Sequence, residues 1–161
     1  MENYVKLSKV VEKLNLKNLT PDVDMTEKKV MVPDINRPAL QLTGFFEHFA
    51  YERVQLIGCV EYTFLENMEE DEKEKIYDML LSYKIPCIIF CRNLKPDDSL
   101  IEKANKANVP VFSTETPTSA FSAEIIRWLN VELAPCTSIH GVLVDVYGVG
   151  VLIMGESGIG K

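Results

Sequence analysis

The sequence has few of the residues that disulfide scaffolds and metal sites require. Its 161 residues include four cysteines and two histidines. No two cysteines form a C-x-x-C pair, the usual start of a zinc or redox motif. Cys87 and Cys91 both fall in the strand-like run CIIFC, which would hold their side chains on one face but about 13 Å apart. We therefore expect reduced, mostly buried thiols and no metal ligands within the chain.

The sequence also lacks an excess of basic residues and a long hydrophobic run. Its formal net charge is −7, which argues against nucleic acid as a partner. The apolar stretches IPCIIFC and GVGVLIM are shorter than the roughly 18 residues that a membrane helix needs. The first residues, MENYVKLSKVVEKL, lack the basic and apolar regions of a secretory signal. We expect a cytoplasmic protein with no membrane and no nucleic-acid partner.

Short apolar runs alternate with segments of helical periodicity along most of the chain. The pattern predicts strands at residues 27–34, 54–60, 86–92 and 109–114. It predicts helices at residues 5–15, 67–84, 97–108 and 116–133, the first with Ser8 as its N-cap and the third with Asp97 or Asp98. The run PCIIFCR is apolar throughout, as expected of an inner parallel strand covered on both faces. The predicted fold class is therefore an α/β sandwich around a mainly parallel sheet, occupying residues 1–133.

A change of character follows residue 133. The segment APCTSIHG contains proline, threonine and serine, and we interpret it as a linker. In the segment IHGVLVDVYGVGVLIMG, apolar residues alternate with other residues, the pattern is interrupted at Gly148–Gly150, and an apolar run follows. This pattern predicts a β-hairpin whose second strand ends at Gly155. Residues 134–161 are therefore expected to be a linker and the beginning of a second domain.

The last seven residues match the phosphate-binding P-loop pattern G-x-x-x-x-G-K. They are Gly155, Glu156, Ser157, Gly158, Ile159, Gly160 and Lys161. Glycines let such a loop wrap a phosphate with its backbone N–H groups pointing inward, and the lysine reaches the β- and γ-phosphates. A dinucleotide-binding fingerprint is the competing interpretation, but Ile153 stands where its third glycine should be. We therefore expect a nucleotide-binding loop directly after an apolar strand.

The chain resembles the HPr kinase/phosphorylase family over essentially its whole length. The segment IHGVLVDVYGVGVLIMGESGIGK is similar to the start of that family's catalytic domain. The segment DINRPALQLTGFFEHFAYERVQLIGCVE resembles its N-terminal domain, although alanine follows Pro38 where many members carry glycine. NVPVFST and LAPCTSIHG also fit.

The resemblance implies a bifunctional enzyme of bacterial carbon catabolite control. Such an enzyme uses ATP, or in many members pyrophosphate, with Mg²⁺ to phosphorylate a serine of the phosphocarrier protein HPr. It also removes that phosphate by phosphorolysis. The family forms hexamers, and its N-terminal domain is similar in fold to that of Mur ligases.

The resemblance also implies roles for individual residues. Gly155 to Lys161 match the nucleotide-binding loop, and Lys161 matches the lysine counted as catalytic. His140 matches the active-site histidine, although a lone histidine is by itself more often a surface or core residue. The residue that ligates Mg²⁺ and the general base would follow Lys161. We expect the 161 residues to be a truncated and inactive part of the enzyme.

Two other functions stay open from the sequence. The chain could be a stand-alone α/β module that binds a small ligand or a partner, with incidental terminal glycines. It could also be the front of an unrelated P-loop NTPase.

Overall fold

The computed structural model describes residues 3–135 with their side chains, and the backbone of residues 141–146 and 149–154. The N-terminal half contains β1 (Val5–Lys6), α1 (Leu7–Lys13), β2 (Lys17–Asn18), β3 (Lys29–Val30), β4 (Ile35–Asn36), the 3-10 helix η1 (Gln41–Thr43), β5 (Val54–Ile57) and α2 (Cys59–Glu66). The remainder contains α3 (Glu70–Leu81), β6 (Ile88–Phe90), α4 (Asp98–Ala107), β7 (Val111–Ser113), α5 (Thr118–Glu132), β8 (Gly141–Val146) and β9 (Val149–Met154).

A five-stranded, mostly parallel sheet forms the centre of residues 3–135. Its strand order is β2-β7-β6-β5-β4, and the pairs from β4 to β7 are parallel. Only β2 is antiparallel to its neighbour. The prediction of an α/β fold around a mainly parallel sheet is confirmed.

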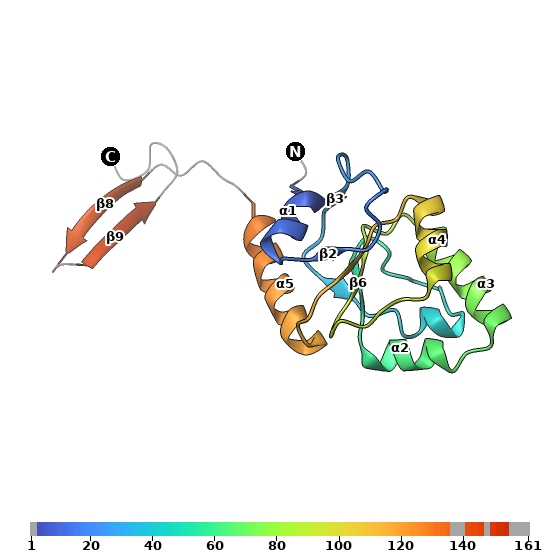
Figure 1. The fold of residues 1–161 in the computed structure, drawn as a ribbon. Coiled ribbons are helices and arrows are strands. Elements are labelled where there is room, and N and C mark those ends of the chain that lie inside the picture. The colour runs from blue at the N-terminus through green and yellow to red at the C-terminus, as the bar shows by residue number, and fades with distance from the viewer. Residues whose placement is uncertain (1–2, 136–140, 147–148, 155–161) are drawn as a thin grey trace.

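Helices cover both faces of this sheet (Figure 1). On one face α1 and α5 pack against alternate strand residues, among them Leu56, Ile89 and Phe112. On the other, α3 and α4 pack with η1 against Ile57 and Phe90. Since β6 is buried along its whole length, its side chains contribute to both cores, which explains its uninterrupted apolar sequence.

The segment expected to be one strand over residues 54–60 is instead a strand followed by a helix. Strand β5 ends at Ile57, and α2 begins at Cys59. Glu61 reaches back to accept a hydrogen bond from the Gly58 N–H at 3.1 Å, which stabilises the start of the helix. Val60 is 71% exposed, although its apolar side chain had been counted as part of the expected strand. Cys59 is exposed too, whereas Cys87 and Cys91 are buried as predicted.

Near the N-terminus one prediction, the Ser8 cap, was wrong, and another, the strand at residues 27–34, is confirmed only in part. Helix α1 begins at Leu7 rather than after Ser8, because the Leu7 N–H donates to the Lys28 carbonyl at 3.0 Å and needs no side-chain cap. Strand β3, within the expected strand at 27–34, pairs with β1 and lies outside the main sheet. The strand that does enter the sheet there is β4, only two residues long.

The predicted hairpin after the linker is confirmed. Strands β8 and β9 are antiparallel, with Gly141 opposite Met154 and Val146 opposite Val149. Strand β9 already begins at Val149, inside the expected glycine-rich break. Within the described residues, no helix is long and apolar enough to span a bilayer.

Candidate functional site

The site residues predicted from the sequence, His140 and Gly155–Lys161, lie outside the described residues. The hairpin that connects them is described. Because Gly141 pairs with Met154, the chain enters β8 and leaves β9 at the same end of the hairpin. In the sequence His140 directly precedes Gly141, and Gly155 directly follows Met154, so each predicted site residue adjoins one member of this pair. An apolar strand directly before the loop is the context that the P-loop motif requires.

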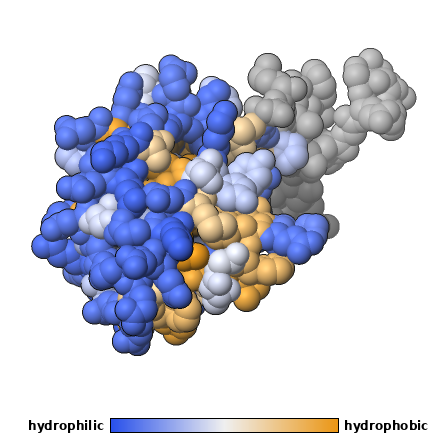
Figure 2. Space-filling view, turned by 90° about the vertical axis from the view of Figure 1, so that its right-hand side faces the viewer, coloured by the Kyte–Doolittle hydropathy of each residue, from blue (hydrophilic) through white to orange (hydrophobic). Residues whose placement is uncertain are grey.

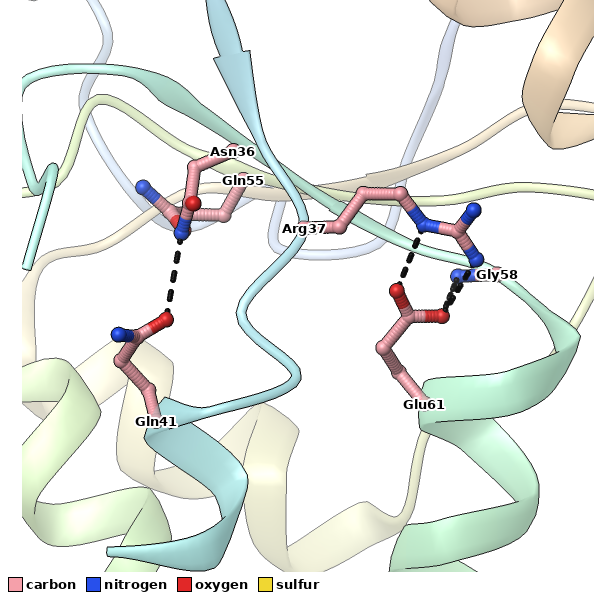
Figure 3. Close-up of polar contacts among 6 residues, drawn as sticks. All are labelled: Asn36, Arg37, Gln41, Gln55, Gly58 and Glu61. Atoms are coloured by element: carbon pink, nitrogen blue, oxygen red, sulfur yellow. Dashed lines mark hydrogen bonds and ion pairs between the residues drawn. The ribbon is translucent and has the colours of Figure 1, made fainter. Parts of the chain in front are cut away.

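A second polar group of residues, which the sequence did not single out, lies at the carboxyl ends of β4 and β5. Arg37 follows β4, and its guanidinium forms a two-pronged ion pair with Glu61 of α2 (Figure 3). The Arg37 Nε donates to Glu61 Oε1 at 2.6 Å, and Nη2 donates to Oε2 at 2.8 Å. The paired planar groups fix the loop after β4 against the first turn of α2.

The burial of this pair is uneven. The Glu61 side chain is 2% exposed and that of Arg37 is 40% exposed. Burial by itself would raise the pKa of Glu61, but hydrogen bonds from Arg37 and the Gly58 N–H outweigh it and lower the pKa. The hydrogen bond to Glu61 raises the pKa of Arg37. Both groups therefore stay charged at neutral pH.

Three amide side chains beside this pair hold the chain between β4 and β5. Asn36 Nδ2 donates to Gln55 Oε1 at 2.7 Å and lies 3.4 Å from Gln41 Oε1 (Figure 3). The fully buried Gln55 donates to the carbonyls of Arg53 and Ala50 at 2.8 and 3.1 Å. Its role is structural, because every polar atom of its amide has a partner within the protein.

Gly58 stands where β5, α2 and α5 meet. A Cβ at this position would lie 2.6 Å from Thr118 Oγ1 and 2.7 Å from Arg37 Nη2. A Cβ there would force Thr118 or Arg37 to shift, so close packing favours glycine at this position. The segment DINRPALQLTGFFEHFAYERVQLIGCVE includes Arg37, Gln55, Gly58 and Glu61. The resemblance to the HPr kinase/phosphorylase family rests partly on this segment, but the sequence does not indicate that these four residues lie together in the fold.

An apolar groove lies between η1, α2 and α3. The face that includes α3 is mostly hydrophilic but carries an apolar area (Figure 2). The groove has a volume of about 590 Å³. Its lining includes Leu42, Phe64, Met68, Ile76 and Met79, with Glu69, Glu72 and Lys75 among its charged residues. Phe64 and Met79 are 44% and 43% exposed, so the groove is open to solvent. In residues 3–135 and the two hairpin strands, no cluster of three or more potential metal ligands was found.

Comparison with known families matches the chain in two consecutive parts. Residues 5–129 match the family described as HPr Serine kinase N terminus. Residues 131–161 match the HPr Serine kinase C-terminal domain.

Curated relatives are similar along nearly the whole chain. The chain is 57% identical over 157 residues to the HPr kinase/phosphorylase of Lachnoclostridium phytofermentans, covering 98% of the chain and 51% of the relative. It is 40% identical to the enzyme of Alkaliphilus metalliredigens, over 98% of the chain and 50% of the relative. The chain thus spans about half the length of the curated relatives it matches.

A solved structure shares the fold. It contains the CBS and DRTGG domains of the regulatory region of Clostridium perfringens pyrophosphatase, complexed with the activator diadenosine tetraphosphate. The TM-score is 0.54 at 17% identity, covering 80% of this chain and 50% of that one. At this identity the likeness concerns the fold alone.

Proposed function

Since the chain belongs to the HPr kinase/phosphorylase family, we propose that it forms the N-terminal domain and the start of the catalytic domain of such an enzyme. The enzyme transfers a phosphoryl group from ATP, or from pyrophosphate, to a serine of HPr in the cytoplasm. It removes that group again by phosphorolysis with inorganic phosphate. The observation that carries the proposal is the order of the two family matches, which meet between residues 129 and 131.

The proposed nucleotide site is the loop from Gly155 to Lys161. Its support in the described structure is strand β9, which ends at Met154 immediately before the first glycine. The backbone N–H groups of Gly155–Gly160 would hold the phosphates, and the Lys161 ammonium would neutralise charge on the group in transfer. ATP supplies the phosphoryl group, and Mg²⁺ neutralises its phosphates. We expect the Mg²⁺ ligand and the general base beyond Lys161.

His140 is proposed to act beside this loop. Its support is the register of the hairpin, in which the neighbour of His140 pairs with the neighbour of Gly155. An imidazole held there can donate a hydrogen bond to a phosphate oxygen or stabilise its charge.

The remaining family properties are part of the same proposal. They are a hexamer formed through the catalytic domains, a domain boundary near residue 133 and a role in carbon catabolite control. We also propose that the N-terminal fold is similar to that of Mur ligases. Residues 1–161 by themselves are expected to be inactive, because the proposed metal ligand and base are not among them.

The test is a transfer assay with the complete gene product, HPr, Mg²⁺ and labelled ATP or pyrophosphate. We expect label on HPr, and its release as pyrophosphate when unlabelled inorganic phosphate is added in excess. Lys161→Ala should abolish both directions, whereas the surface variant Lys106→Ala should leave them unchanged. No transfer from either donor would refute the proposed activity.

A further inference from the structure

The apolar groove between η1, α2 and α3 exposes large side chains at the surface of the core. Leu42 and Ile76 line it and are buried, so they form its floor. Phe64 of α2 and Met79 of α3 line it and are exposed, so they form its walls. Met68, between the two helices, lies beside them. Apolar side chains gathered around a groove mark an interaction surface, because covering them removes apolar area from water.

The shape of the groove suits an α-helix. On α3 its lining runs from Glu69, the N-cap, to Met79, ten positions later. At 1.5 Å per residue this distance is about 15 Å, or nearly three turns of a partner helix. None of the lining residues belongs to a strand, so the groove offers no sheet edge to an extended peptide. A helix satisfies its own backbone groups and can lay an apolar face into such a groove.

The charges on the rim of the groove are mainly negative. Glu69 and Glu72 line it and are exposed, and neither takes part in an ion pair within the described part of the chain. The dipole of α3 favours acidic residues at this end, but Glu70 and Asp71, which do not line the groove, already supply them. Lys75 is the one basic residue in the lining. The rim therefore complements a basic partner and repels an anionic membrane or nucleic acid.

We propose that this groove docks an amphipathic α-helix of a partner protein, with large apolar residues on one face and lysine or arginine along a border of that face. The apolar residues lie between Phe64 and Met79, and the basic residues pair with Glu69 and Glu72. The flexible side chains of Met68 and Met79 adapt to the apolar residues of the partner. The groove belongs to the N-terminal domain, and docking there does not depend on the proposed kinase activity.

The test measures the binding of a designed peptide to the 161-residue chain by fluorescence anisotropy. The probe is a labelled helix of about 18 residues, with leucines on one face, lysines along the border of that face, and alanine and glutamine elsewhere. One control peptide has the same composition in scrambled order, and another has glutamate in place of lysine. We expect both controls to bind at least about tenfold more weakly than the probe. Equal binding of either control would overturn the proposal, because a docked amphipathic helix needs both the apolar face and the basic border.

Variants of exposed residues locate the binding on the chain. Met79→Gln removes an apolar wall and should weaken binding of the probe about tenfold, whereas Val131→Gln, at an exposed apolar residue of α5, should leave it unchanged. The double variant Glu69→Gln, Glu72→Gln should weaken binding about fivefold at low salt and reduce its salt dependence. Asp71→Asn is the matched control, on the same turn but outside the groove. The melting temperature of each variant shows that the fold is retained, and unchanged binding in either Met79→Gln or the double variant contradicts docking at this groove.

Two other occupants are distinguished by further measurements. Sedimentation velocity tests a second copy of the chain, and a dimer that Met79→Gln dissociates would mean that the groove pairs with that copy. Titration of the complete gene product with the same probe tests the rest of that protein. A probe that binds the 161-residue chain but not the complete product would mean that residues beyond Lys161 cover the groove. Either result overturns the proposal, and binding to both forms without such a dimer supports it.

Discussion

Removing the Glu61 carboxylate should destabilise the N-terminal domain more than any change at its surface. The carboxylate accepts three hydrogen bonds, at 2.6, 2.8 and 3.1 Å, and is almost fully buried. A hydrogen bond to a charged group contributes about 1.5–3 kcal/mol. The Arg37 side chain is 40% exposed and can regain water, so the penalty for an orphaned charge is only partial. We expect Glu61→Ala to lower the free energy of unfolding by about 3 kcal/mol.

Glu61→Gln separates charge from shape. The amide oxygen can still accept from the Gly58 N–H or from Arg37, but the ion pair is lost. We expect a loss of about 1–2 kcal/mol, smaller than that of Glu61→Ala, because part of the hydrogen bonding survives. Glu66→Gln is the matched control, because Glu66 is exposed on the same helix; it should change stability by less than about 0.5 kcal/mol.

The assay is urea unfolding of the 161-residue chain, followed by circular dichroism and by the fluorescence of its single tryptophan, Trp128. A loss below about 0.5 kcal/mol in Glu61→Ala would refute the reasoning, because it would mean that the ion pair does not hold α2 to β4.

Three further predictions concern stability. Gly58→Ala should cost about 1–3 kcal/mol in the same unfolding assay, because its Cβ would lie 2.6 Å from Thr118 Oγ1; a neutral effect would show that the neighbours can retreat. Since the pKa of Glu61 is lowered on folding, its contribution is complete above the unfolded pKa of about 4.3 and is lost as the pH falls through the lower folded pKa. Unfolding measured from pH 7 to pH 3 should show this loss, and Glu61→Gln should flatten the curve; equal slopes would contradict the assignment. Lys73 is 6% exposed and lies 3.0 Å from each of the exposed carboxylates of Glu70 and Asp97. Its replacement by alanine should cost about 1 kcal/mol through lost packing of the side chain and loss of the two ion pairs, against less than about 0.5 kcal/mol for the nearby exposed Lys75→Ala; similar losses in the two variants would refute the role of the buried Lys73 side chain.

The parts of the fold that the sequence predicts well are those governed by local pattern. Strand β6 is apolar throughout because both of its faces are covered, and α5 shows Phe121, Ile125 and Leu129 at helical spacing on its buried side. The hairpin is visible because its strands alternate and a glycine-rich break separates them. In these segments the residues that determine the structure are close neighbours in the chain.

The parts that the sequence did not predict depend on contacts between distant residues. Helix α2 was missed because its start is fixed by Glu61 and Arg37, which are 24 positions apart. Strand β4 has only two residues, and its place in the sheet is set by pairing with β5 rather than by its own periodicity. Thr118 meets Gly58 across 60 positions of the chain. The loop at Gly155–Lys161, by contrast, is one contiguous motif and could be found without knowledge of the fold.

The central proposal is that the complete gene product, of which this chain forms the N-terminal part, phosphorylates a serine of HPr, and the most direct test is to identify the phosphorylated residue. The complete gene product and its Lys161→Ala and His140→Ala variants are incubated with HPr, ATP and Mg²⁺, and HPr is analysed by mass spectrometry. The account predicts phosphoserine on HPr with the unaltered enzyme, none with Lys161→Ala and less with His140→Ala. Unmodified HPr, or phosphoserine that persists in Lys161→Ala, would contradict it.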